Sequence, residues 1–147
     1  MSDIKVPVLV VGGGSSGMMT SIMLSCYGID HLMIERHEGT SLLPKAHYLN
    51  QRAMEVFRQF GIADDVYAVG TPIANMSSVV WQTTLGGDGP LQGKRFHKMD
   101  CFGGGALAER YERDSPCPST NHPQLRLEPI LREHAEKRAP GKVLFNH

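Results

Sequence analysis

Cysteine is scarce in this chain of 147 residues, and its three copies, Cys26, Cys101 and Cys117, form no CxxC pair. An odd and scattered set argues against both a disulfide framework and a thiolate zinc site. The simplest compartment for such a chain is the reducing cytosol, so we expect a cytoplasmic protein.

A charge imbalance and long apolar runs are also missing. Lys plus Arg and Asp plus Glu each count 15, so nothing electrostatic favours nucleic acid or an anionic membrane surface as a partner. No apolar run approaches the roughly 18 residues of a membrane span, and the N-terminal apolar run is too short for a signal peptide. With 41% hydrophobic and 20% charged residues, the composition is that of an ordinary soluble globular protein.

Metal and dehydrogenase motifs are absent as well. The seven histidines show no HExxH and no paired metal spacing, so we predict no metal site. Four of them lie among mixed polar neighbours and are interpreted as surface residues: His31, His37, His97 and His134. No tyrosine is followed four places later by lysine, which excludes a short-chain dehydrogenase active site.

The N-terminal third of the chain has the pattern of a βαβ unit. Val6 to Val11 is apolar on both faces, as a buried parallel strand would be. Apolar residues at spacings of three and four predict a helix over Ser16 to Tyr27, which Gly28 would end. His31 to Glu35 is a second short apolar strand.

Further elements are readable only in part. A helix is predicted near residues 50–60, with Asn50 as its cap and Gly61 at its end. Ser77 to Thr84 has strand character, whereas the turn-rich and proline-rich stretches that follow predict no definite fold. Helical spacing returns from Leu127, with Pro129 acceptable in a first turn, and residues 143–145 read as a final strand.

The glycines between the first strand and helix indicate a dinucleotide site. Gly12, Gly14 and Gly17 fit GxGxxG: the first allows a tight turn, the second lets backbone approach a pyrophosphate, and the third lets helix pack on strand. The following helix N-terminus offers unpaired N–H groups and a partial positive charge to a diphosphate. Met18 and Met19 stand where a P-loop needs Lys and Ser or Thr, which argues against that alternative.

A carboxylate in the right place restricts the ligand. Glu35 lies 18 positions after Gly17, at the end of the second strand, where it can accept both hydroxyl hydrogens of an adenosine ribose. A 2′-phosphate would meet like charge there, even with Arg36 next door. The residues therefore predict FAD or NAD and disfavour NADP, and the motif alone does not choose between the first two.

Three segments, taken together, resemble the FAD-dependent aromatic hydroxylases, the single-component flavoprotein monooxygenases similar to para-hydroxybenzoate and phenol hydroxylases. They occur in the family's order and cover a little under half of the chain. The second and third are more particular to these hydroxylases than the first. The segments are VLVVGGGSSGMMTSIMLSCYGIDHLMIER, PKAHYLNQRAMEVFRQFGI from Pro44 to Ile62, and QLRLEPILREHA from Gln124 to Ala135.

The resemblance implies FAD, with its adenosine on Glu35 and its diphosphate on the glycine loop. Gln124 matches a family glutamine that faces the ribityl chain, and an amide that donates and accepts suits a sugar alcohol. Lys45 stands near a position where family members often carry Arg, and supplies charge without the planar fork. The full set of expected cofactor contacts is Gly12, Gly14, Ser16, Gly17, Glu35, Arg36, Lys45 and Gln124.

The expected fold is α/β, a Rossmann-like FAD-binding βαβ unit with a parallel sheet plus the beginning of a substrate-domain sheet. Residues 1–75 are assigned to the N-terminal part of the FAD-binding domain, 76–120 to the start of the substrate domain, and 121–147 to the return. The family's later Asp-Gly and Gly-Asp…Ala-His segments are absent in context, so the chain resembles an incomplete, N-terminal portion. We expect an isolated 1–147 chain to be inactive.

The leading interpretation is a monooxygenase that uses NADH or NADPH and O2 to hydroxylate a phenol-like aromatic substrate. The cofactor carries that chemistry, so no catalytic side chain is named. An NAD-dependent dehydrogenase and a non-catalytic dinucleotide-binding module are the alternatives. The particular substrate, the choice of reductant and the oligomeric state stay open.

Overall fold

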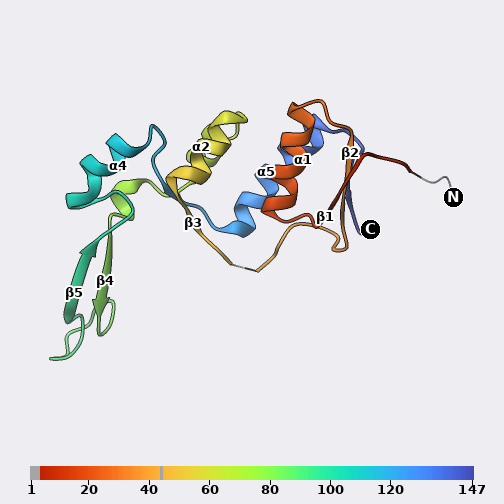
Figure 1. Ribbon diagram of the computed structural model, residues 1–147. Coiled ribbons are helices and arrows are strands. Elements are labelled where there is room, and N and C mark those ends of the chain that lie inside the picture. The colour runs from red at the N-terminus through yellow and green to blue at the C-terminus, as the bar shows by residue number, and fades with distance from the viewer. Residues whose placement is uncertain (1–3, 44) are drawn as a thin grey trace.

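A parallel three-stranded sheet forms one end of the molecule (Figure 1). The computed structural model describes residues 4–43 and 45–147, so Pro44, the first residue of the second resembling segment, lies outside them. Strand β1 (Val8–Val11) is followed by helix α1 (Ser15–Cys26) and strand β2 (His31–Glu35), and β2 also pairs with β7 (Val143–Phe145). The predicted strand, helix and strand are confirmed, with their ends shifted by at most two residues.

Helix α5 (Gln124–Arg138) lies beside α1 on the same side of this sheet (Figure 1). Their inner faces meet residues of β2 in a core of fully buried side chains, among them Met18, Ile22, Met33 and Leu131. The methionines of the first helix are thus core residues. Burial of such side chains is the main favourable contribution to the folding of this unit.

The other face of the sheet is uncovered, which corrects one prediction. Val6 to Val11 reads as a strand buried on both faces, yet Leu9 is 53% exposed and Val11 is 76% exposed. An apolar composition indicates only that a strand can be buried on both faces, as strands are in most parallel sheets. Which face is covered depends on the helices that pack there, and α1 and α5 both take the same one.

His31 is likewise not a surface residue. It is 3% exposed, because it lies two residues from the buried Met33 along β2 and so faces the helices on the same side of the strand. Its Nε2 lies 2.7 Å from the hydroxyl of Ser21 on α1, and its Nδ1 lies 3.0 Å from the carbonyl oxygen of Ile29. The ring is therefore satisfied inside the core, which its polar sequence neighbours do not reveal.

Helix α5 starts at Gln124, three residues before the apolar period that begins at Leu127. The N–H of Gln124 donates to Ala46 and the N–H of Leu127 to Pro123, so backbone hydrogen bonds begin the helix at Gln124. Pro129 consequently lies in the second turn rather than in the first. Its missing N–H costs one hydrogen bond within the helix.

A short antiparallel pair links the middle of the chain to α5. Strand β3 (Tyr48–Leu49) pairs with β6 (Thr120–Asn121), within a stretch that the sequence left as a loop. Helix α2 (Gln51–Gln59) follows directly, and the side chain of Asn50 accepts the N–H of Ala53 at 2.9 Å. The predicted cap and the stop at Gly61, where φ is 67°, are both confirmed.

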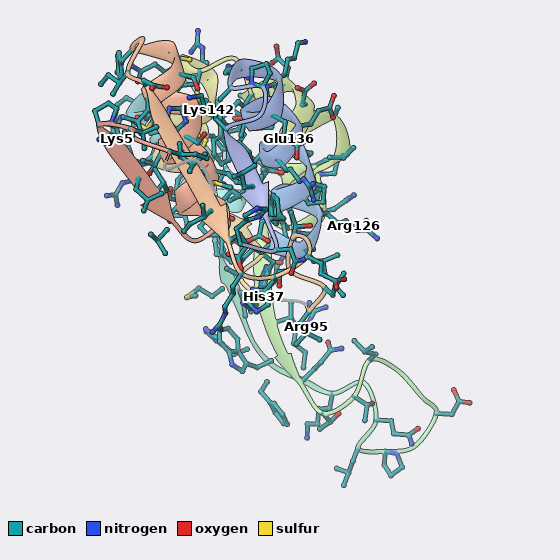
Figure 2. All side chains as sticks on the ribbon, turned by 90° about the vertical axis from the view of Figure 1, so that its right-hand side faces the viewer. Lys5, His37, Arg95, Arg126, Glu136 and Lys142 are labelled. Carbon is teal, nitrogen blue, oxygen red and sulfur yellow. The ribbon has the colours of Figure 1, made fainter. Side chains whose placement is uncertain are left out.

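The remaining elements extend to the opposite end of the molecule. They are α3 (Ala63–Val69), the short helix η1 (Ile73–Asn75), β4 (Ser78–Gln82), β5 (Arg95–Asp100), η2 (Gly105–Leu107) and α4 (Ala108–Asp114). Strand β4 confirms the predicted strand, whereas α3, β5 and α4 were not predicted. Figures 1 and 2 show the β4–β5 hairpin, to which Arg95 belongs, projecting away from the other elements.

The described ranges, 4–43 and 45–147, contain neither a membrane-spanning helix nor a cluster of metal ligands. None of their helices combines the length and apolar character needed to cross a membrane. Within the same ranges, no group of three or more His, Cys, Asp or Glu side chains is placed to hold a metal ion.

Candidate dinucleotide-binding site

The glycine turn between β1 and α1 restricts side chains at its first and third glycines. Gly12 has φ of 108°, a conformation that favours glycine, and its N–H donates to the carbonyl of Ile34 at 2.8 Å. A Cβ on Gly17 would overlap the carbonyl oxygen of Gly12. The first and third glycines therefore do what GxGxxG predicts: they make the turn and bring the helix onto the strand.

The start of α1 is suited to an anion. Its N-cap is Gly14, which offers no side chain to the first N–H groups, and the first turn carries no acidic residue. The first N–H groups of a helix have no partner within the helix, and the helix dipole adds partial positive charge there. A diphosphate can thus be held by backbone alone at Gly14, Ser15 and Ser16.

Glu35 ends β2 beside this turn. One of its carboxylate oxygens accepts the N–H of Gly13 at 2.7 Å, and the other accepts the N–H of His37 at 2.9 Å and contacts the His37 Nδ1 at 2.5 Å. The Gly13 hydrogen bond and then the two from His37 lower the pKa of Glu35 from 4.5 to about 2. The carboxylate is thus charged at neutral pH and fixed at the edge of the turn, as a ribose contact requires.

A cavity of about 710 Å³ lies beside the glycine turn. It brings together five of the eight residues predicted from the sequence: Gly12, Gly14, Ser16, Gly17 and Gln124. Its walls are otherwise largely apolar, from Met19 on α1, Val56 and Phe57 on α2, and Leu127 on α5. Cavities with apolar walls and a few polar groups are typical of cofactor sites.

Three predicted residues do not line this cavity. Glu35 bonds the N–H of Gly13, a turn residue that does not line the cavity either, so a ligand would have to extend past the turn to reach it. Arg36 and Lys45 are exposed, and neither appears among the described side chains of the cavity wall. Their expected contacts with a cofactor stay predictions.

The β3–β6 pair brings the second and third resembling segments together. The N–H of His122 donates to the carbonyl of His47 at 2.7 Å, and that of Gln124 donates to Ala46 at 2.8 Å. Residues more than 70 positions apart in sequence thereby share one cavity wall. The sequence shows the segments but not this pairing, since long-range strand contacts leave little trace in two-residue strands.

Glu128 was missed by the sequence analysis. It is 2% exposed, and its carboxylate accepts the Gln124 Nε2 at 2.6 Å and the N–H of Ser41 at 2.8 Å, with the Ser15 hydroxyl at 3.5 Å. It ties the head of α5 to the glycine turn and to the loop after β2. Only its spacing of four residues from Gln124 on one helix face could have pointed to it.

A βαβ unit with a glycine turn, a helix N-terminus free of side-chain caps and a fixed carboxylate after the second strand defines a dinucleotide-binding protein. Residues 5–147 match the model of the FAD binding domain family, and the chain belongs to that family. The predicted α/β fold of an FAD-dependent monooxygenase is confirmed by this match and by the solved structures it resembles.

Known relatives are aromatic hydroxylases. The chain is 37% identical over 134 residues to aklavinone 12-hydroxylase DnrF of Streptomyces peucetius subsp. caesius, covering 90% of this chain and 26% of that protein. It is 33% identical over 139 residues to phenol 2-monooxygenase of Pseudomonas sp., covering 92% of this chain and 21% of that protein.

A solved structure agrees over almost the whole chain. The flavin-dependent monooxygenase PieE, in complex with FAD and substrate, has a TM-score of 0.90 and 39% sequence identity, over 99% of this chain and 24% of its own. The chain therefore spans about a quarter of the length of the relatives that it matches.

Proposed function

We propose that this chain binds FAD and forms part of a monooxygenase that hydroxylates an aromatic, phenol-like compound. The observation that carries the proposal is that the glycine turn and Gln124 line one cavity. Gly17 and Gln124 are 107 positions apart in the sequence. The glycine turn alone is common to many dinucleotide-binding proteins. The resemblance to the aromatic hydroxylases requires in addition that Gln124, at the start of α5, lie beside the turn.

The roles of the residues follow from their placement. Gly12 and Gly17 shape the turn, and the N–H groups beyond Gly14 hold the diphosphate, with Ser16 at the same helix start. Glu35 accepts the hydroxyl hydrogens of the adenosine ribose. The amide of Gln124 faces the ribityl chain and is held in place by Glu128 at 2.6 Å.

Arg36 and Lys45 complete the proposed set of contacts. Both are exposed cations beside the segments that form the site, and so can approach the phosphates or the adenosine from solvent. Lys45 supplies a point charge without the bidentate fork of arginine. We expect each to contribute less than Glu35.

The cofactor supplies the redox chemistry when it is bound. In the overall reaction NADH or NADPH, a proton and O2 are consumed, one oxygen atom enters an aromatic C–H bond as hydroxyl, and the other leaves as water. The part of the protein is to hold and orient the cofactor, admit the substrate and exclude water. An electron-rich ring is the substrate class that the relatives' names support.

The arrangement of the strands supports a division of the chain between two domains. Residues 1–75 and 121–147 would belong to the FAD-binding domain, because β1, β2 and β7 share one sheet across those ranges. Residues 76–120 would begin the substrate domain, since they hold the β4–β5 hairpin that stands apart from that sheet (Figure 1). We place the protein in the cytoplasm, consistent with the free thiols of Cys26, Cys101 and Cys117.

Purification tests the cofactor first. The intact protein should copurify with, or take up, FAD and show flavin absorbance, whereas NAD+ alone should not saturate the site. Substrate-dependent oxidation of NADH or NADPH with formation of a hydroxylated product, measured over a panel of phenols, tests the reaction. Tight binding of NAD+ without FAD would favour the dehydrogenase alternative, and FAD binding without turnover would favour a non-catalytic module.

A further inference from the structure

His122 is a buried polar residue, and one of its two ring nitrogens, Nε2, lacks a partner among the described residues. The side chain is 2% exposed, and among the described residues none lies within hydrogen-bond distance of its Nε2 atom. Buried polar atoms are almost always hydrogen-bonded, because a buried donor or acceptor without a partner destabilises the fold. The position of this atom therefore requires an explanation.

The backbone is held on both sides of His122. Its N–H donates to the carbonyl of His47 at 2.7 Å, directly after the β3–β6 pair, and α5 begins two residues later at Gln124. A side chain between a paired strand and a helix start has little freedom to turn toward another partner. Burial lowers the pKa of His122, against a backbone hydrogen bond with Arg126 that raises it, so the imidazole is neutral at neutral pH.

His122 lines the same cavity as Gly14 and Gln124. The cavity walls are mostly apolar, and Glu35, which bonds Gly13 of the glycine turn, does not line the cavity. A dinucleotide with its adenosine on Glu35 and its diphosphate at the turn would therefore direct its second half into this cavity. A flat heteroaromatic ring on a sugar-alcohol chain matches both the apolar walls and the few polar groups.

We propose that the Nε2 atom of His122 hydrogen-bonds the ribityl–isoalloxazine half of bound FAD. A neutral imidazole can donate to or accept from a flavin without bringing in charge, and the bond would satisfy the buried atom. The inference rests on the proposed function, because it presupposes that FAD is the dinucleotide.

Two ligands and three variants test the contact in the intact protein. FAD contains both halves of the dinucleotide, whereas ADP contains only the adenosine diphosphate half. His122→Leu removes the polar atom, His122→Gln returns an amide of similar reach, and His134→Leu is the control. His134 lies on α5 and pairs with Asp65, outside the cavity wall.

The expected result is specific to FAD. In His122→Leu the dissociation constant for FAD, measured by calorimetric titration, should rise about five- to tenfold, while that for ADP stays unchanged. His122→Gln should recover most of the FAD affinity, and His134→Leu should bind both ligands as the wild type does. Without ligand, His122→Leu should unfold at the same or a higher temperature, since it removes an unpartnered polar atom.

Other outcomes overturn the contact. Unchanged FAD affinity in His122→Leu, or equal weakening of FAD and ADP, would mean that the ring does not touch the flavin half. If the wild type binds ADP but not FAD, the proposed function falls together with the contact. If the wild type binds FAD, and the His122 variants bind FAD and ADP as tightly as the His134→Leu control does, the His122 contact is wrong but the proposed function stands.

Discussion

The carboxylate of Glu35 accepts a hydrogen bond of 2.7 Å from the backbone N–H of Gly13, a residue 22 positions earlier in the chain. This bond joins the end of β2 to the glycine turn and orients the carboxylate along the edge of the proposed diphosphate site. The same side chain therefore shapes the turn and, in the proposed FAD complex, presents a charged acceptor to the ribose.

Removal of that carboxylate should weaken binding of the adenosine half. We expect Glu35→Ala to reduce the affinity for FAD by about 1.5 to 3 kcal/mol, the range for hydrogen bonds to a charged group. ADP should lose a similar amount, because the contact is made by its ribose. Glu38→Ala, at an exposed position three residues after the end of β2, is the control. Unchanged FAD affinity in titrations of Glu35→Ala would remove Glu35 from the site.

The low pKa of Glu35 predicts a pH dependence of stability. Because folding lowers this pKa from 4.5 to about 2, the charged carboxylate stabilises the folded state fully above about pH 4.5. That contribution should disappear as the pH falls from about 4.5 to about 2. Urea denaturation at several pH values should show wild type and Glu35→Gln converging over this window. A difference that stays constant down to pH 2 would contradict the assignment.

The second and third glycines should respond differently to the same substitution. Gly14 has φ of −75° and ψ of −178°, extended backbone open to any residue, and a Cβ there would meet only the Glu128 carboxylate at 3.7 Å. Gly14→Val should therefore fold but lose FAD binding, because its branches occupy the space of the diphosphate. Gly17→Val should unfold at a clearly lower temperature, since its Cβ overlaps the Gly12 carbonyl.

Circular dichroism and FAD titration together check this pair. Retention of FAD by a folded Gly14→Val protein would show that the diphosphate lies elsewhere. Equal thermal stability of Gly17→Val and wild type would show that the turn is less tightly closed than its geometry indicates.

The buried pair of Ser21 and His31 should matter for stability alone. Because the carbonyl of Ile29 can only accept, the His31 Nδ1 carries the hydrogen and Nε2 accepts from the Ser21 hydroxyl. Ser21→Ala leaves this buried nitrogen unpartnered and should cost about 1 to 3 kcal/mol of unfolding free energy.

Ser25→Ala is the matched control on the same helix, since Ser25 bonds only a backbone carbonyl of its own helix. It should change the unfolding free energy by less than about 0.5 kcal/mol. A loss in Ser21→Ala no larger than in Ser25→Ala, measured by urea denaturation, would count against the buried hydrogen bond.

Local patterns in the sequence determined the βαβ unit and its glycine turn. The apolar periods, Gly28 and Gly61 as helix stops, and Asn50 as a cap act over a few residues, so they can be read directly. The turn residues Gly12 and Gly17 were predictable for the same reason: the conformation they allow is a property of single positions.

Only the tertiary structure decided which faces are buried and which distant residues meet. Hydropathy could not show that Leu9 and Val11 face outward or that His31 faces inward, because burial depends on where α1 and α5 pack. The pairing of β3 with β6, and the partners of Glu128 and His122, depend on contacts between segments far apart in sequence. Such contacts form when the chain closes on itself, and no local propensity encodes them.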